Sequence, residues 1–252
     1  MLKKNAEVVA IIPSRYGSMR LPGKPLVSIG SKCLIQRVYE NAVKSDLFDR
    51  IIIATDHPTI EMMAQSMGAE VVMTSKKHRT GTDRCAEVAN SLKGDELIVN
   101  VQGDEIIVNW DGLNNLIDLM KENIYEVGTL ASPIVTKAEL FSPHSVKVVF
   151  DRLGRALYFS RAAIPYVRDE KEENWLDKTA FYRHIGVYAY SFPVLQDLAG
   201  LGASSLESAE NLEQLRWMEF GYDIGVIESG LWESVGIDTE EDLEQAKMYF
   251  VD

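Results

Sequence analysis

Short runs of valine and isoleucine recur along the first half of the chain, and helical patterns separate them. The runs include VVAII at 8–12, RIIIAT at 50–55 and ELIVNV at 96–101. Because these runs lack polar alternation, we expect strands that are covered on both faces. The strand-helix-strand order predicts right-handed crossovers, and hence a mainly parallel sheet with helices on both faces. The first half should therefore fold as a Rossmann-like α/β structure.

The pattern changes after about residue 125, where strand-like runs follow one another with fewer helices between them. These runs are EVGTLASPIV, VKVVFD, ALYFSR and HIGVYAYS, and they indicate a mixed or antiparallel extension of the sheet. No linker rich in Pro, Gly or Ser divides the chain. We therefore predict a single domain over 1–252, with a core at about 1–125 and 222–252 and an inserted subregion at about 126–221.

Composition and charge restrict the classes of function. The 252 residues carry a formal net charge of -12, and the sequence pI is about 4.9. Because phosphate binding requires a basic face, this balance argues against a broad nucleic-acid surface. No run approaches the ~18 apolar residues of a membrane span, and Cys33 and Cys85 lack a disulfide or zinc spacing. We expect a soluble cytoplasmic protein that binds neither nucleic acid nor membrane.

One local cluster of positive charge stands against this acidic background, in the segment IIPSRYGSMRLPGKPL. Arg15, Arg20 and Lys24 lie there without an acid among them, and we call residues 15–24 the cationic loop. Glycines and fixed cations after a first strand favour an anionic ligand. The segment lacks Walker A spacing, and the chain has no G-x-G-x-x-G motif. The loop predicts a clamp for a group such as a triphosphate; the alternative is a solvated surface loop.

This segment resembles the signature of the cytidylyltransferases that activate 3-deoxy-manno-octulosonate (Kdo), the CMP-Kdo synthetases. Further blocks match the same family in the same order: ATD (54–56), HRTGTDR (78–84), NVQGDE (100–105), YFSRAAIPY (158–166), HIGVYAYS (184–191), LEQLRWMEFG (212–221) and GIDTEEDL (236–243). The resemblance implies a GT-A-like nucleotidyltransferase fold, in which the inserted subregion binds the sugar and forms a homodimer. It also implies Mg²⁺-dependent, in-line transfer of CMP from CTP to the anomeric hydroxyl of Kdo, with release of pyrophosphate, for lipopolysaccharide biosynthesis.

Two aspartates are candidates for the metal site. Asp104 follows the apolar run LIVNV and should lie at the carboxyl end of a buried strand, where α/β folds bind ligands. Its carboxylate suits Mg²⁺, which prefers hard oxygen ligands. Asp238 precedes the last predicted helix and could instead be its N-cap, with Glu241 completing a capping box. The family resemblance assigns both aspartates to the metal.

The resemblance divides the other candidate residues between a nucleotide side and a sugar side. The nucleotide side comprises Arg15, Arg20, Lys24, Gly81, Thr82, Arg84 and Gln102. The sugar side comprises Gln102, Arg161, His184, Tyr188, Glu213 and Gln214. Catalysis is assigned to Arg15 and Lys24 together with the two aspartates. Lys24 would offset negative charge on the leaving pyrophosphate.

Several of these residues also have a purely structural interpretation. Thr82 could cap a helix, Arg161 could pair with an acid, and His184 could be a core imidazole. Glu213 and Gln214 could form an exposed helix face. A sugar acid nevertheless requires an arginine for its carboxylate and amide or imidazole groups for its hydroxyls. The family assignment therefore makes Arg161 the expected partner of the sugar carboxylate.

The chain departs from the family at Ile106, where many members continue Q-G-D-E with proline. Because proline would fix φ and remove an N–H, isoleucine predicts a less rigid loop after Asp104.

Three other functions remain open from the sequence. The acceptor could be another sugar acid, such as an 8-amino analogue of Kdo or a sialic acid. A GT-A glycosyltransferase would share the fold, but should show D-x-D on the metal strand, where this chain has Q-G-D-E. A catalytically silent nucleotide-binding protein is the third alternative, and the retained aspartates and cations argue against it.

Overall fold

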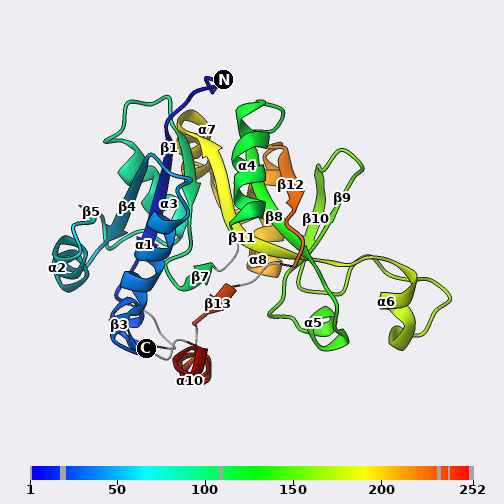
Figure 1. Ribbon diagram of the computed structural model, residues 1–252. Helices are drawn as coiled ribbons and strands as arrows, with labels where there is room; N and C mark the ends of the chain where they lie inside the picture. Colours follow the sequence, from blue (N-terminus) through cyan, green and yellow to red (C-terminus); the bar gives the residue numbers. More distant parts are fainter. Residues whose placement is uncertain (1, 18–20, 108–109, 232–233, 238, 250–252) are drawn as a thin grey trace. The chain divides into compact units, whose positions relative to one another are not determined.

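The computed structural model describes residues 2–17, 21–107, 110–231, 234–237 and 239–249 (Figure 1). The chain divides into two compact units. Unit 1 comprises Met1–Trp110, Ser191–Ala199 and Glu233–Asp252, and unit 2 comprises Asp111–Tyr190 and Gly200–Trp232.

The described part of unit 1 is built on four parallel strands in the order β6-β1-β4-β5. They are β1 (Val8–Ser14), β4 (Arg50–Thr55), β5 (Glu70–Met73) and β6 (Leu97–Asn100). Nearly every residue of β1 and β6 is buried, as expected for apolar strands that are covered on both faces. The parallel sheet expected from the valine and isoleucine runs is therefore confirmed.

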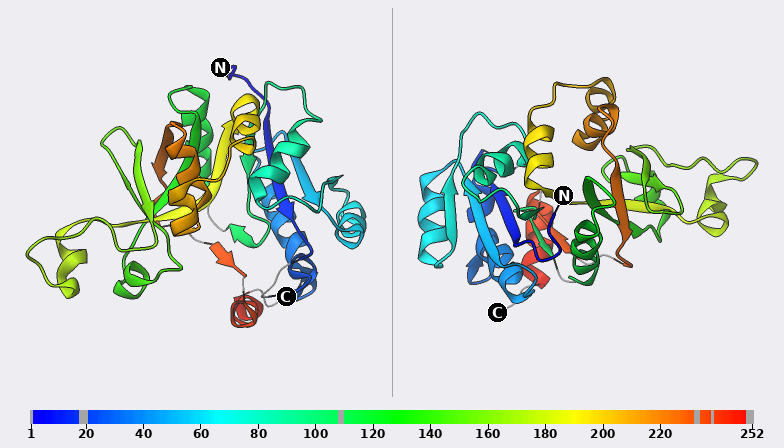
Figure 2. Two further views of the ribbon diagram at one scale, coloured as in Figure 1. Left: turned by 180° about the vertical axis from the view of Figure 1, so that it is seen from behind. Right: turned by 90° about the horizontal axis from the view of Figure 1, so that it is seen from above.

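Helices cover both faces of this sheet. The helices that pack on its strands are α1 (Leu34–Lys44), α2 (Pro58–Ser66) and α3 (Gly81–Ala89). Unit 1 also contains α7 (Phe192–Ala199) and α10 (Glu240–Tyr249). The chain steps from β1 to β4 to β5 in one direction and then returns to the other side of β1 as β6. Because crossovers are right-handed, α1 and α3 lie on opposite faces (Figure 2). α7 packs against α3, where the Gln196 side chain donates to the Ala86 carbonyl at 2.8 Å.

Short elements complete unit 1 near the carboxyl ends of the strands. They are the 3₁₀ turn η1 (Lys24–Leu26), the hairpin of β2 (Ser28–Ile29) and β3 (Lys32–Cys33), and the antiparallel pair of β7 (Glu105–Ile107) and β13 (Ser234–Gly236). Ile106 is buried in β7 and lies opposite Val235. The segment after Asp104 is therefore a paired strand rather than the loop that was expected there.

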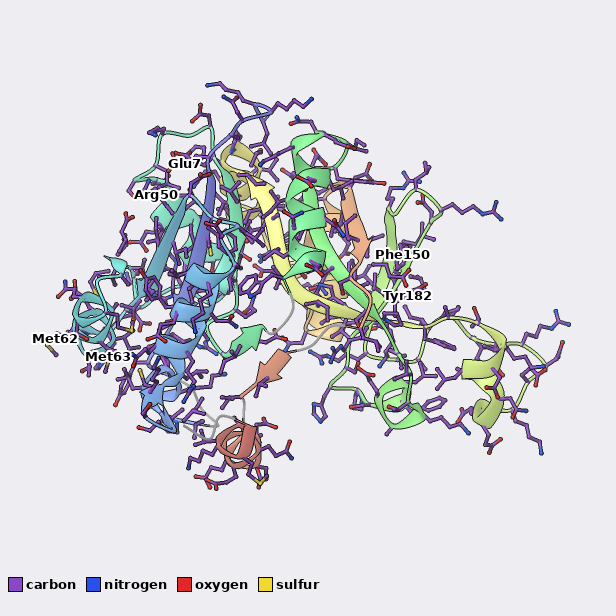
Figure 3. All side chains as sticks on the ribbon, in the orientation of Figure 1. Glu7, Arg50, Met62, Met63, Phe150 and Tyr182 are labelled. Carbon is purple, nitrogen blue, oxygen red and sulfur yellow. The ribbon has the colours of Figure 1, made fainter. Side chains whose placement is uncertain are left out.

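Unit 2 contains a mixed sheet. β8 (Val127–Pro133) pairs antiparallel with β11 (Tyr182–Ser191) and parallel with β12 (Ile224–Glu228), while β9 (Lys147–Phe150) pairs antiparallel with β10 (Ala156–Ser160). β9 also contacts β11, where the rings of Phe150 and Tyr182 lie 4.8 Å apart (Figure 3). The mixed extension expected after residue 125 is confirmed.

The helices of unit 2 are mostly short. They are α4 (Asp111–Lys121), α5 (Lys137–Phe141), the 3₁₀ turn η2 (Glu172–Asn174), α6 (Trp175–Lys178), α8 (Ser205–Glu210) and α9 (Glu213–Glu219). α4 lies directly on β8, because Gly128 lets it approach: a Cβ there would stand 2.6 Å from the Leu116 and Met120 side chains. No helix in the described residues is both long and apolar enough to cross a membrane.

The boundaries of the two units differ from those expected. The core was predicted to include residues up to about 125 and from 222 onward, but α4 and β12 belong to unit 2. The reason is pairing: β12 joins β8 in parallel, and α4 covers both strands. Conversely, α7 returns to unit 1. The apolar pattern identifies these elements, but not the sheet that each one joins.

Candidate functional site

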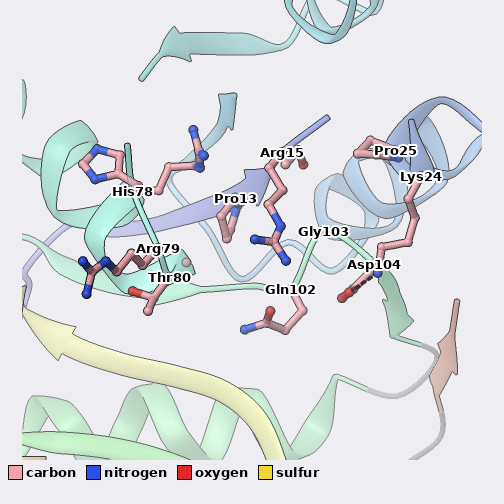
Figure 4. A pocket seen from close by; sticks show the side chains of 13 residues that line it. Pro13, Arg15, Lys24, Pro25, His78, Arg79, Thr80, Gln102, Gly103 and Asp104 are labelled. Atoms are coloured by element: carbon pink, nitrogen blue, oxygen red, sulfur yellow. Dashed lines mark hydrogen bonds and ion pairs between the residues drawn. The ribbon is translucent and has the colours of Figure 1, made fainter. Parts of the chain in front are cut away.

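A cavity of about 470 Å³ opens in unit 1 at the carboxyl ends of β1 and β6 (Figure 4). Its lining residues are Pro13, Ser14, Arg15, Lys24, Pro25, His78, Arg79, Thr80, Gly81, Arg84, Gln102, Gly103 and Asp104. The strand order reverses between β1 and β6, since the chain builds outward from β1 on one side and returns on the other. Ligands of open α/β sheets bind at such a switch point. The cavity is therefore the candidate ligand site.

The cavity is strongly positive although the protein is acidic. Arg15, Lys24, Arg79 and Arg84 line it, and Asp104 is the one acid among its described lining residues. The start of α3 also faces the cavity, and the positive end of a helix dipole adds to this field. Such a combination of cations and backbone N–H groups suits a multiply charged anion.

Lys24 and Asp104 form an ion pair at one side of the cavity, marked by the dashed line in Figure 4. Lys24 Nζ donates to Asp104 Oδ2 at 2.6 Å, and the lysine side chain is only 13% exposed. The Asp104 carbonyl accepts from the Ile237 N–H at 2.9 Å, which fixes the backbone behind the carboxylate. Arg15 lines the same cavity as Lys24 and Asp104, so the structure brings these three predicted residues together.

The segment between β6 and Asp104 lies unusually close to the end of β1. A Cβ on Gly103 would stand 2.5 Å from the Pro13 carbonyl oxygen and 2.7 Å from Ser14 Oγ. Because those contacts are too short for any side chain, glycine is required here. This close approach places Gln102 and Asp104, which flank the glycine, beside the residues that follow β1.

The start of α3 differs from the expectation in its cap. Thr80 rather than Thr82 is the N-cap: Thr80 Oγ1 accepts from the Asp83 N–H at 3.1 Å. Thr82 is buried in the helix and does not belong to the described lining of the cavity, whereas Gly81 does. The cap lies two residues earlier because the helix already begins at Gly81.

Arg84 lines the cavity from a buried position, and its guanidinium is already engaged. It donates to Asp56 Oδ2 at 2.9 Å and to the Thr74 hydroxyl. Arg84 therefore links Asp56, which follows β4, to Thr74, which follows β5. It also contributes positive charge to the cavity wall.

Sequence reasoning missed several residues that line the cavity. His78, Arg79 and Thr80 lie in the quoted block HRTGTDR, but only its later members were selected. The rule that a helix N-terminus attracts anions would have found them, because they directly precede α3. His78 is held by the Glu87 carboxylate, which also accepts from the Ser75 N–H at 2.8 Å.

The candidate sugar residues other than Gln102 all lie in unit 2. His184 Nε2 is 3.1 Å from Thr129 Oγ1, and its ring contacts those of Phe159 and Tyr188, with centroids at 5.0 and 5.4 Å. Burial lowers the pKa of His184 from 6.5 to about 3. Burial, and to a smaller extent the charge of Glu213, raises the pKa of the Tyr188 hydroxyl well above its usual value. Both groups are neutral at pH 7 and can offer hydrogen bonds to hydroxyls.

Arg161 is held by main-chain carbonyls and does not pair with an acid through its side chain. Its Nε donates to the Glu210 carbonyl at 2.7 Å, its Nη1 to Pro143 at 2.9 Å and its Nη2 to Asn211 at 3.3 Å. The alternative of a side-chain ion pair is therefore wrong for the described residues. Its assignment to the sugar carboxylate stays a prediction.

Glu213 and Gln214 begin α9, but they do not form an exposed face. Gln214 is buried, and the Glu213 carboxylate accepts from Arg216 Nη2 at 2.7 Å. The exposed-face alternative is wrong because α9 turns this side toward the core of unit 2, next to Leu215 and Trp217.

Two predicted residues, Arg20 and Asp238, lie outside the described residues. The capping role considered for Asp238 belongs to the next residue. Thr239 Oγ1 accepts from the Asp242 N–H at 3.1 Å, and Asp242 Oδ2 accepts from the Thr239 N–H at 2.9 Å. This reciprocal pair is a capping box formed without Asp238 or Glu241.

The neutral state of His184 predicts a pH dependence of stability. Its pKa is about 3 in the folded chain and 6.5 in the reference state. Between these values the unfolded chain binds a proton that the folded chain does not, so stability should fall as pH falls, by up to about 1.4 kcal/mol per pH unit. Urea unfolding from pH 7 to 4 should give a shallower pH slope for His184→Gln than for the natural chain. His144→Gln, at an exposed histidine, is the control; equal slopes in all three proteins would contradict the prediction.

Comparisons with known proteins agree with this geometry. Residues 9–224 match a family described as cytidylyltransferase. The chain is 43% identical to the 3-deoxy-manno-octulosonate cytidylyltransferase of Parabacteroides distasonis, over 94% of this chain and 96% of the relative. It is also 43% identical to the enzyme of that name from Neisseria gonorrhoeae, over 97% and 98%.

Solved structures give the same picture. A CMP:2-keto-3-deoxy-manno-octonic acid synthetase complexed with CTP is similar with a TM-score of 0.89 and 38% identity, over 97% of this chain and 98% of the other. A putative glucose-1-phosphate thymidylyltransferase from Bacillus anthracis shares the fold at a TM-score of 0.66 and 15% identity, over 96% and 94%. The predicted nucleotidyltransferase fold is thus confirmed.

Proposed function

Since this chain belongs to the family of the 3-deoxy-manno-octulosonate cytidylyltransferases, we propose that it transfers CMP from CTP to the anomeric hydroxyl of Kdo. The observation that carries the proposal is the positive cavity at the switch point of unit 1, where cations of the cationic loop face Asp104. The relatives named above bear this activity in their names, and the structural relative was solved with CTP.

In the proposed reaction the anomeric oxygen attacks the α-phosphorus of CTP in line. A new P–O bond to the sugar forms, the bond to the β-phosphate oxygen breaks, and pyrophosphate leaves with the bond's electron pair. Because little covalent chemistry falls to the protein, its residues act by position and charge. We assign Arg15 and Lys24 to the triphosphate, where Lys24 offsets charge on the leaving group. The α3 N-terminus, with Thr80 and Gly81, contributes N–H donors to the same anion.

We propose Mg²⁺ as the cofactor, and the donor chemistry fits it. Mg²⁺ is usually bound by one or two carboxylates together with substrate phosphates and water. Asp104 supplies one carboxylate in the cavity, and the described residues hold no cluster of three or more metal-ligating side chains. Ile237, which precedes the second candidate Asp238, donates its N–H to the Asp104 carbonyl. When bound, Mg²⁺ neutralises phosphate charge and lowers the pKa of the attacking hydroxyl.

For the sugar acid we assign the carboxylate to Arg161 and the hydroxyls to neutral groups of unit 2. Within the described chain, its three carbonyl contacts leave Arg161 two of the five N–H donors of a guanidinium, one on each terminal nitrogen. A carboxylate can take two such donors together. His184 and Tyr188 are neutral hydrogen-bonding groups, as an uncharged polyol requires.

We further propose a cytoplasmic homodimer that serves lipopolysaccharide biosynthesis, as the family assignment implies. Several large apolar side chains of unit 2 are exposed, including Val135 (65%), Leu157 (53%) and Tyr166 (75%). Exposed apolar side chains of this size favour a partner surface. A second copy is the simplest partner for a chain of this family.

The proposed function is tested by measuring pyrophosphate release with each of the four ribonucleoside triphosphates and a panel of sugar acids. We expect release only with CTP, and fastest with Kdo rather than its 8-amino analogue or a sialic acid. Faster turnover with the 8-amino analogue would show that this analogue, rather than Kdo, is the acceptor. No release with any pair would leave only nucleotide binding and would overturn the proposal.

A further inference from the structure

We propose that Glu210 is a positioning residue, which fixes Arg161 relative to α9 and so shapes the acceptor site. Glu210 is the last residue of α8 and contacts the end of β10 through three oxygens. Its Oε1 accepts from Ser160 Oγ at 2.6 Å, its Oε2 from the Arg161 N–H at 2.9 Å, and its carbonyl from Arg161 Nε at 2.7 Å. This inference rests on the proposed function, because it assigns a role toward the sugar acid.

The junction between α8 and α9, residues 210–213, determines where α9 begins. Asn211 ends α8 in the left-handed conformation, with φ of 52°, and its carbonyl accepts from Arg161 Nη2 at 3.3 Å. α9 then starts at Glu213, followed by Gln214. Because the chain between Glu210 and Glu213 is this short, holding Glu210 on β10 also holds the two sugar-side residues of α9 at a fixed distance from Arg161.

Lys147 supports this arrangement from the opposite side. It is fully buried, and its Nζ donates to the carbonyls of Ser142 at 2.8 Å, Ser145 at 2.5 Å and Arg161 at 2.7 Å. Its neighbour Val146 accepts from the His184 N–H at 2.8 Å. The ends of β9, β10 and β11 are thus tied together at the residues that the family assignment gives to the sugar.

These contacts predict a preorganised guanidinium. A free arginine side chain would lose rotamer entropy on binding a carboxylate, whereas Arg161 is already fixed by three carbonyl acceptors. Two of those acceptors, the carbonyls of Glu210 and Asn211, belong to the junction that the Glu210 carboxylate anchors. Loosening the junction should therefore weaken sugar-acid recognition without affecting the nucleotide cavity, whose lining residues all belong to unit 1.

The test is Glu210→Gln, which keeps the size of the side chain but offers one good acceptor in place of two. We expect the KM for Kdo to rise about tenfold, while kcat and the Kd for CTP, measured by calorimetry, change by less than about twofold. Glu219→Gln is the matched control. Glu219 makes the same pair of contacts, to the Ser205 hydroxyl at 2.7 Å and the Leu206 N–H at 3.0 Å, but it does not contact Arg161 in the described structure.

The outcomes separate this inference from the proposed function. An inactive natural chain would remove the proposed function, whatever the variants do. If the natural chain is active and the KM for Kdo is the same in Glu210→Gln and Glu219→Gln, the positioning role is overturned. The role is also overturned if Glu210→Gln weakens CTP binding by the same factor as it raises the KM for Kdo. If Glu210→Gln does not fold, Ser160→Ala gives a second comparison. It removes the hydroxyl that donates to Glu210 Oε1 and accepts from the Ala162 N–H at 3.0 Å; an unchanged KM for Kdo would then decide against the role.

Discussion

Replacing Asp104 by asparagine is expected to lower turnover by about 100-fold, because in the proposed site it removes a charged metal ligand, which is worth about 2.7 kcal/mol in the transition state. The carboxylate lies in the positive cavity and is the one acid among its described lining residues. Asparagine has the same shape and can still accept from Lys24, so the change tests charge rather than packing. We expect little loss of stability, because the carboxylate side chain is 38% exposed.

A matched control is available at the surface. Asp95 pairs with Lys3 at 2.6 Å, the same distance as the pair of Asp104 with Lys24, but it lies outside the cavity lining. Asp95→Asn should leave turnover unchanged. Calorimetric titration of Mg²⁺ into enzyme and CTP should show weaker binding only for Asp104→Asn. Near-normal turnover in a folded Asp104→Asn variant would show that Asp104 is not a metal ligand.

Much of unit 1 and its site could be predicted from sequence because the relevant rules are local. Short runs rich in valine and isoleucine, such as VVAII and LIVN, favour buried strands, and parallel strands bring their carboxyl ends to one edge. Asp104 and the cationic loop follow two such strands, so their meeting in one cavity needed no long-range information. The cap of α3 was misplaced by two residues, because Thr80 and Thr82 are equally suitable capping residues.

Unit 2 was less predictable because its organisation depends on long-range contacts. Nothing in the sequence of β12 shows that it pairs with β8, about a hundred residues earlier in the chain. Gln214 has a polar side chain but is buried, and Arg161 is bound by carbonyls from two distant loops. Every residue has a main-chain carbonyl, so residue type does not show which residues accept from Arg161. An acidic side chain was therefore the alternative partner that the sequence offered.

Lys24→Ala is expected to weaken CTP binding by about 10- to 100-fold while leaving the affinity for CMP nearly unchanged. A charge-assisted hydrogen bond is worth about 1.5–3 kcal/mol, and in our assignment Lys24 makes it to the phosphates that CMP lacks. Calorimetry with both nucleotides measures the difference directly. Lys32→Ala is the control, since Lys32 pairs with Glu40 at 2.5 Å and is not among the described lining residues of the cavity.

The ion pair gives the same variant a second, opposite effect. In the structure the Lys24 ammonium holds the Asp104 carboxylate at 2.6 Å, so a divalent cation must compete with it. Removing the lysine should therefore tighten Mn²⁺ binding in the absence of nucleotide, even as CTP binding weakens. A structural role for Lys24 would instead weaken both. Equal losses of affinity for CTP and CMP would show that Lys24 does not contact the β- and γ-phosphates. An unchanged affinity for Mn²⁺ would show that the metal and Lys24 do not compete for the Asp104 carboxylate.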